Sequence, residues 1–357
     1  MAWVLAIRHR LSGRSRGQNT PAARNARGEW QPENLPKPGV LFSWPVEPLA
    51  ILKFFFGPEG LLVPWNGLYF GLAVVSALFL TPSMERMSSI SFDWIALIYL
   101  RNAALVTLFA GGLHVRLYIR KAQGIKYKYT DKWPSKRDAK FLFNNQTGDN
   151  VFWSLTSGVV VWSAYEAMTL WAYANELLPF IDWKTRPVYF IALLLAVSFM
   201  REIHFYWVHR ICHWKPIYKI SHYLHHKNIN VGPWSGLSMH PIEHLLYFSW
   251  VLLHWIIPSH PVHAVAFLMH AGLSPAKGHS GYFRFILNSG GETKSEKSIK
   301  ADDYFHYLHH RFFTVNFGNE AIPLDKWFGS FHDGSPEAHG EMMARRKSSR
   351  RSPEIKR

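Results

Sequence analysis

Long apolar stretches constrain the fold of this chain more than any other feature. A helix needs about 20 mostly apolar residues to cross a bilayer. Four segments have that length and character, at residues 61–80, 94–117, 151–174 and 188–209. The sequence therefore predicts an all-α integral membrane bundle of about four transmembrane helices.

A fifth apolar stretch, residues 245–273, differs from these four. Pro258 and Pro261 interrupt it, and it is too short for two complete spans. Proline removes a backbone donor and breaks a helix. We therefore expect a re-entrant or interfacial hairpin here.

The basic residues indicate how the bundle is oriented. The formal net charge is +16, and Lys and Arg gather before the first span, in residues 116–140 and in residues 345–351. Cytoplasmic loops are enriched in Lys and Arg. Four crossings place every basic segment on one side, so both termini and the histidine-rich part are expected to face the cytoplasm. A bacterial inner membrane and an endoplasmic reticulum both fit.

The same charge distribution argues against a nucleic-acid partner, because it lies on tails and one loop and accompanies no nucleic-acid motif. Residues 1–30 lack the apolar stretch of a cleaved signal peptide, but their composition is compatible with a transit peptide.

The predicted organisation is a basic tail at 1–45, one membrane domain at 46–335 and a second basic tail at 336–357. Arg101 and Glu166 lie inside apolar spans, where pairing is favoured over a channel role.

Histidines supply the chemical signal. Sixteen of the 20 lie between His204 and His310. Residues three or four apart share one face of a helix, and this spacing recurs in three groups: His209 and His213, then His222, His225 and His226, then His306, His309 and His310. Imidazole suits iron, zinc, copper and nickel. The pattern predicts a site for more than one metal ion.

Four further histidines are candidates with weaker support. His240 precedes a proline that can begin a helix, so it would lie just before that helix. His279 follows the predicted hairpin and can return to the cluster. His244 and His270 are lower-ranked candidates. The single cysteine, Cys212, is expected to be a small buried filler.

Taken together, these motifs resemble the fatty acid hydroxylase and sterol desaturase superfamily, and its sterol C5-desaturase-like branch most closely. The resemblance covers residues 198–334. It rests on the order and spacing of several motifs: Glu202…Tyr206-Trp-Val-His209-Arg-Ile-Cys-His213, His222-Tyr-Leu-His225-His226, His240-Pro-Ile-Glu243, His306-Tyr-Leu-His309-His310 and Asn316-Phe-Gly318…Trp327.

The resemblance implies an O2-dependent di-iron membrane oxidoreductase. Such an enzyme hydroxylates or desaturates a sterol or fatty acyl chain by C–H abstraction, and zinc can replace iron in purified protein. The implied iron ligands are His209, His213, His222, His225, His226, His240, His279, His306, His309 and His310. Glu202, Glu243 and Asp303 are the acids expected to orient these imidazoles. The implied architecture is a membrane stem with a cytoplasmic, His-rich helical cap.

Electrons must come from a partner, because the chain has no dinucleotide-binding fingerprint and no Cys-x-x-Cys iron–sulfur motif. A cytochrome b5-like protein or a ferredoxin with its reductase is implied. An alternative class is a non-catalytic or transport membrane protein that binds zinc or iron through the histidines. A transporter should place its ligands along the spans, whereas the motifs here cluster beyond the fourth.

Overall fold

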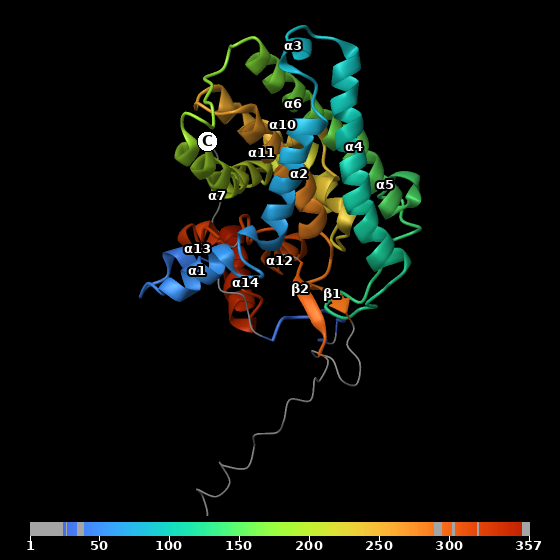
Figure 1. The fold of residues 1–357 in the computed structure, drawn as a ribbon. Helices are drawn as coiled ribbons and strands as arrows, with labels where there is room; N and C mark the ends of the chain where they lie inside the picture. Colours follow the sequence, from blue (N-terminus) through green and yellow to red (C-terminus); the bar gives the residue numbers. More distant parts are fainter. Residues whose placement is uncertain are drawn as a thin grey trace, which may run out of the picture.

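The computed structural model describes residues 24–25, 27–33, 39–288, 295–301, 304–319 and 321–351. Most of these residues are helical (Figure 1). Strands β1 (Arg284–Asn288) and β2 (Lys297–Lys300) form one antiparallel pair. The predicted all-α class is thus right for the bundle, and this small hairpin is an addition that the sequence did not suggest.

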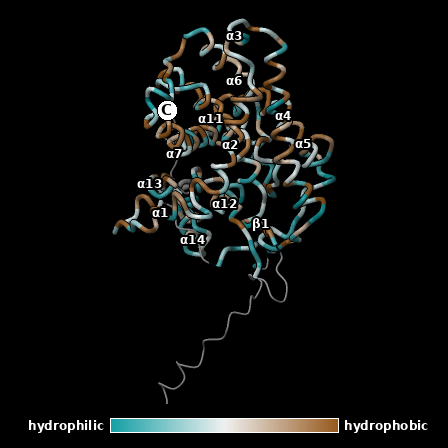
Figure 2. Tube along the Cα trace, in the orientation of Figure 1, coloured by the Kyte–Doolittle hydropathy of each residue, from teal (hydrophilic) through white to brown (hydrophobic). Residues whose placement is uncertain are grey.

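Among the residues that the structure describes, three helices are long and apolar enough to cross a membrane. They are Leu62–Phe79, Phe92–Ile119 and Pro187–Cys212, and they coincide with the first, second and fourth predicted spans. The first joins η2 (Leu62–Asn66) to α2 (Gly67–Phe79), the second joins α4 (Phe92–His114) to η3 (Val115–Ile119), and the third is α7. Hydrophobic residues run along all three, while hydrophilic ones gather near β1 and α14 (Figure 2).

The third predicted span is helical but is not among these three, so the expected count of four is not reached. It comprises α5 (Gln146–Trp153), η5 (Ser154–Gly158) and α6 (Val159–Ala174). α6 buries polar side chains, among them Ser163 and Thr169, against neighbouring helices. Protein rather than lipid surrounds much of its surface, and a helix in that position can be less apolar.

α6 nevertheless lies beside α4 and runs in the opposite direction (Figure 1). α4 begins just after α3 (Met84–Met87), and α6 ends beside the same short helix. The Asn175 side-chain amide donates a hydrogen bond of 3.0 Å to the carbonyl oxygen of Ser88 at that point. α6 therefore extends along the same bundle as the apolar helices.

A buried ion pair joins these two helices. The Arg101 guanidinium donates to the Glu166 carboxylate, and Asn102 donates a 3.0 Å hydrogen bond to its other oxygen. The Arg101 and Glu166 side chains are only 4% and 1% exposed. Pairing was the role predicted for both charges, and the structure confirms it.

The apolar stretch at residues 245–273 forms two arms. The first contains α10 (Pro241–Phe248) and η8 (Ser249–Trp255), and the second is α11 (Pro261–Gly278). α11 is buried along nearly its whole length and packs against α2, α4, α6 and α7. The second arm is therefore the central helix of the bundle, and the re-entrant or interfacial position of the hairpin stays a prediction.

Close packing of α11 depends on Gly272. A Cβ atom at this position would lie 2.3 Å from the ring of Trp162 on α6. We expect Gly272→Ala to lower the free energy of unfolding by about 1–3 kcal/mol, the usual range for overpacking a core. Gly112→Ala in α4 is the matched control, because no atom lies within 4 Å of its added Cβ. Thermal unfolding in detergent compares them, and equal midpoints would contradict the close approach.

The other described helices mostly carry or surround the histidine motifs, and all of them except α14 are short. They are η1 (Val40–Phe42), α1 (Pro48–Phe56), η4 (Leu142–Asn144), α8 (Lys215–Ile217), η6 (Tyr218–His222), α9 (Tyr223–His226), η7 (Pro233–Leu237), α12 (Tyr304–Phe312), α13 (Leu324–Trp327) and α14 (Pro336–Arg351).

Both predicted tails contain ordered structure within the described residues. α14 occupies most of the region expected to be a C-terminal tail. Near the other end, Trp30 is buried and its backbone N–H donates a 2.9 Å hydrogen bond to the carbonyl of Tyr129. Part of the predicted N-terminal tail thus packs on the domain.

Candidate metal centre

The structure brings nine of the ten predicted ligands together near the C-terminal end of α7. They form two groups, in each of which one nitrogen per residue lies within 4.8 Å of the others. Group A contains His209, His213, His222, His226 and His309, and group B contains His225, His279, His306 and His310. All are buried except His213, which is half-buried.

Helical spacing explains how the histidines divide between the groups. In the η6–α9 segment, His222 and His226 are four residues apart and belong to group A, while His225 belongs to group B. α12 has the reverse arrangement, with His306 and His310 in group B and His309 in group A. Residues four apart project on the same helix face, so each triplet supplies both groups.

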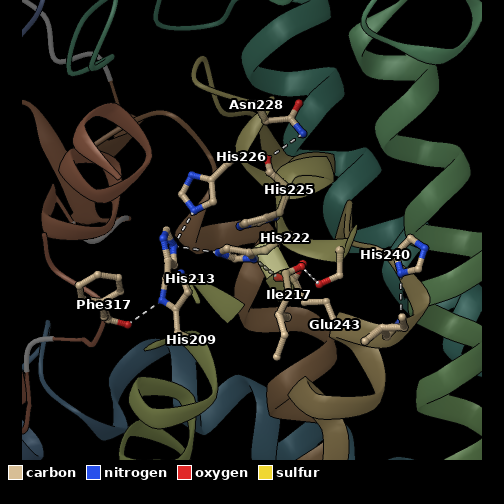
Figure 3. Close-up of polar contacts among 12 residues, drawn as sticks. His209, His213, Ile217, His222, His225, His226, Asn228, His240, Glu243 and Phe317 are labelled. Carbon is tan, nitrogen blue, oxygen red and sulfur yellow. Dashed lines mark hydrogen bonds and ion pairs between the residues drawn. The ribbon is translucent and has the colours of Figure 1, made fainter. Parts of the chain in front are cut away.

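Hydrogen bonds at Nδ1 fix the orientation of several rings. His209 Nδ1 lies 2.7 Å from the carbonyl oxygen of Phe317 (Figure 3), and His309 Nδ1 lies 2.6 Å from that of Val315. In group B, His279 Nδ1 lies 3.0 Å from the carbonyl oxygen of Pro275. A carbonyl oxygen only accepts, so each Nδ1 carries the proton and each Nε2 presents a lone pair.

These lone pairs point at one another across short distances. His213 Nε2 lies 3.0 Å from Nε2 of His226 and 3.1 Å from Nε2 of His309. His226 Nε2 and His309 Nε2 are also 3.0 Å apart. One neutral imidazole cannot donate to several acceptors through one nitrogen. Two nitrogen ligands at right angles, each about 2.1 Å from a metal, would be about 3 Å apart. A shared cation fits this spacing.

Group B repeats the arrangement around His279. Its Nε2 lies 3.0 Å from Nε2 of His306, 3.1 Å from that of His310 and 3.3 Å from that of His225. The residues present therefore fit a second cation equally well.

Burial keeps these side chains in the form that binds metal. Removal from water lowers the pKa of His222 and of His225 to about 3. Desolvation disfavours the charged imidazolium, so both rings are neutral near pH 7. Because metals bind only unprotonated imidazole, no proton has to be displaced from these rings at that pH.

A cavity of about 560 Å³ adjoins both groups. His209, His222, His225, His279 and His306 line one part of it. It continues between α1, α2, α7 and α11. The site can therefore receive an elongated molecule beside the histidines.

Comparison with known proteins agrees with this geometry. The fatty acid hydroxylase family model matches residues 194–330, which contain all nine grouped histidines. The histidine-rich region is therefore similar to the fatty acid hydroxylase and sterol desaturase superfamily. The expected resemblance is thus confirmed.

The individual proteins that are similar to this chain are named sterol desaturases. A Delta(7)-sterol 5(6)-desaturase of Gibberella zeae is 29% identical over 158 residues, covering 41% of this chain and 43% of its own length. One of Aspergillus fumigatus is 29% identical over 42% of this chain and 51% of its own. A Delta(7)-sterol-C5(6)-desaturase of Nicotiana tabacum is 27% identical, with 43% and 53% covered. The chain thus spans about half the length of these relatives. No solved structure matches it.

Three other histidines that were predicted as ligands, or as lower-ranked candidates, lie outside groups A and B. His240 caps the start of α10, where its Nδ1 accepts a 3.3 Å hydrogen bond from the backbone of Ile242, and it points away from the cluster (Figure 3). His244 Nδ1 lies 2.8 Å from Ser157 Oγ. His270 Nε2 lies 2.8 Å from Asn66 Oδ1.

The three predicted acids have different positions. Glu243 Oε1 lies 2.7 Å from His222 Nδ1, whereas Glu202 Oε2 accepts a 2.9 Å hydrogen bond from the backbone of Ile322. Asp303 lies outside the described residues. The carbonyls of Phe317, Val315 and Pro275 were not foreseen, because every residue has a carbonyl and sequence gives no sign of which ones orient a ligand.

Removing the Glu243 carboxylate should weaken metal binding in group A. Loss of a partner that orients a ligand typically lowers metal affinity about 10–100-fold. We expect Glu243→Ala to show this loss in competition with a soluble chelator. Glu202→Ala is the control, because Glu202 accepts its hydrogen bond from the backbone N–H of Ile322. Equal affinities of the two variants would exclude the orienting role.

Proposed function

We propose that this protein is an O2-dependent di-iron membrane oxidoreductase that hydroxylates or desaturates a lipid. The observation that carries the proposal is the convergence of two groups of histidine side chains beside a cavity, in a region that matches the fatty acid hydroxylase family model. Imidazole ligands suit iron. The names of the desaturase relatives support the same class of reaction.

The residues of this chain would hold the ions, orient the substrate and exclude water. Bound iron supplies an oxidant strong enough to remove hydrogen from an unactivated C–H bond, which no side chain can do. Phe205 lies between the cavity and the cluster, with its ring 4.9 Å from that of His209. Hydroxylation and desaturation both begin with hydrogen abstraction, so the same arrangement serves either outcome.

We also propose that the substrate enters from the bilayer beside α1. Ala50, Lys53 and Phe54 of this helix line the cavity. Leu49, Leu52 and Phe56 are 64%, 56% and 68% exposed. An exposed apolar helix of this kind lies in the membrane interface. It would bring the cavity to the level at which lipids are available.

We propose that α6 is a fourth membrane-spanning helix, enclosed within the bundle. Its antiparallel run beside α4 supports this, although α6 is not among the helices that are long and apolar enough to cross a membrane by themselves. Four crossings leave the basic segments, both termini and the histidine groups on the cytoplasmic side. The endoplasmic reticulum and a bacterial inner membrane are the compartments that fit this arrangement.

An electron-donor protein, cytochrome b5-like or ferredoxin-like, is the proposed partner. Three histidine motifs are followed by cations, and two of these are already paired. Lys227 lies 2.8 Å from Asp149, and Arg311 lies 2.7 Å from Glu29. Arg210 is exposed and its guanidinium stacks over Phe317, which leaves it as the best placed of the three to meet an acidic donor.

Metal analysis and turnover test the proposal together. The purified protein should contain about two iron or zinc ions per chain and, once loaded with iron, should oxidise a sterol or fatty acyl lipid in the presence of O2 and a reductant. Metal without turnover on any lipid would favour a non-catalytic relative. No metal in well-folded protein would overturn the proposal. Transport is less favoured, because the histidine groups lie at one end of α7 rather than along the spans.

A further inference from the structure

Arg201 is a cation in an unusual position. It lies within the apolar helix Pro187–Cys212 and lines the cavity. One guanidinium nitrogen donates a 2.8 Å hydrogen bond to the hydroxyl of Tyr247. Among the described residues, no carboxylate lies within ion-pair distance of it, and its Nε atom is buried without a hydrogen-bond partner. A charge at such a position is costly and usually serves a function.

Three neutral polar side chains line the same cavity. Asn66, at the end of η2, donates a 3.0 Å hydrogen bond to Ser198 on α7 and lies 2.8 Å from His270 on α11. Arg201 reaches the same part of α11 through Tyr247, whose hydroxyl donates a 2.9 Å hydrogen bond to the carbonyl oxygen of Ala271, next to His270. We call Asn66, Ser198, Arg201 and His270 the polar cluster.

The polar cluster is separated from the metal groups by an aromatic ring. Phe205 lies 5.8 Å from the Arg201 guanidinium carbon, and its ring centre lies 4.9 Å from that of His209. The three residues are spaced four apart on α7, so Arg201 and His209 are separated by about 12 Å along the helix axis. Arg201 and the histidine groups thus lie on the order of 10 Å apart along the wall of the cavity that α7 provides.

We propose that the polar cluster binds the carboxylate of a long-chain acyl substrate. A guanidinium forms two parallel hydrogen bonds with a carboxylate, which is the strongest pairing available to Arg. The proposal rests on the proposed lipid oxidation and narrows its substrate. The oxidised carbon would lie about 10 Å along the chain from the carboxylate, given the rise of α7 between the two ends.

This separation distinguishes the substrate from a sterol that is desaturated at carbon 5. In such a sterol the oxygen of the ring hydroxyl is only three bonds away from carbon 5. The hydroxyl could not reach the polar cluster while carbon 5 lies at the histidine groups. The cavity therefore favours an acyl chain, even though the relatives are named sterol desaturases.

Equilibrium binding to the intact purified protein tests the inference without any turnover. The probes are a long-chain fatty acid, the alcohol of the same chain length and a Delta(7)-sterol, at a pH where the acid is ionised. We expect the acid to bind at least tenfold more tightly than the alcohol, and more tightly than the sterol. Equal binding of acid and alcohol to the unsubstituted protein, or tighter binding of the sterol, would overturn the proposal.

Substitutions then locate the contact. Arg201→Gln should remove the preference for the acid, and Arg201→Lys should retain part of it. Arg210→Gln is the matched control on the same helix, because Arg210 does not line the cavity. Metal content shows whether each variant is folded. A preference that survives Arg201→Gln would contradict the assignment. Because binding is measured, an absence of oxidation would count against the proposed function alone.

Discussion

Replacing His309 by alanine should remove about one metal ion per chain and abolish lipid oxidation. His309 Nε2 lies 3.0 Å from Nε2 of His226 and 3.1 Å from that of His213, so it is a central member of group A. Without His309, the other histidines of group A would provide an incomplete set of ligands for a metal ion. Elemental analysis of the purified variant measures the effect beside an assay of turnover.

A second substitution examines group B separately. His225→Ala should also lower metal content by about one ion, and the double variant should retain little metal. His260→Ala is the control, because His260 lies outside both groups and caps α11. It should keep metal and activity. Full metal retention in His225→Ala or His309→Ala, together with lost activity, would contradict the ligand assignment.

Glu166→Ala should cost about 3–5 kcal/mol of stability, the usual effect of removing one partner of a buried ion pair. The substitution leaves Arg101 buried without its carboxylate, because both side chains are almost fully enclosed. Thermal unfolding in detergent should show a large fall in the midpoint. The double substitution Arg101→Met/Glu166→Leu should recover most of it, since no unpaired charge then remains.

An exposed ion pair provides the comparison. Arg86 and Asp93 pair at the surface with side chains 54% and 53% exposed. Arg86→Ala should therefore lower the free energy of unfolding by less than about 1 kcal/mol. Similar losses in Arg86→Ala and Glu166→Ala would mean that the Arg101–Glu166 pair is not enclosed as described.

The sequence predicted the apolar helices and the collection of histidines because both leave local patterns. Length and apolarity identify α2, α4 and α7. The two triplets and the His209–His213 pair supply eight of the nine histidines that the structure brings together, and His279 is the ninth. The assignment of these histidines as ligands stays a prediction until metal is measured.

Other features depended on tertiary contacts that no local pattern carries. The apolar stretch now seen as α11 gives no sign that it forms the central helix of the bundle. α6 looked like an ordinary span, although neighbouring helices bury its polar side chains. His240 has suitable sequence neighbours, but its position before Pro241 makes it a helix cap outside both groups. The division of the triplets between groups could have been foreseen from the four-residue spacing.

The Arg101–Glu166 pair also bears on how the chain enters a bilayer during synthesis. α4 is made first and carries Arg101 before its carboxylate partner exists. A lone charge at the centre of a membrane helix costs about 2.5–3.5 kcal/mol on insertion scales. α6 carries Glu166, a charge that makes it poorly suited to insert alone. If α6 crosses the bilayer as proposed, α4 and α6 would be expected to partition together, as an antiparallel pair whose charges are neutralised on entry.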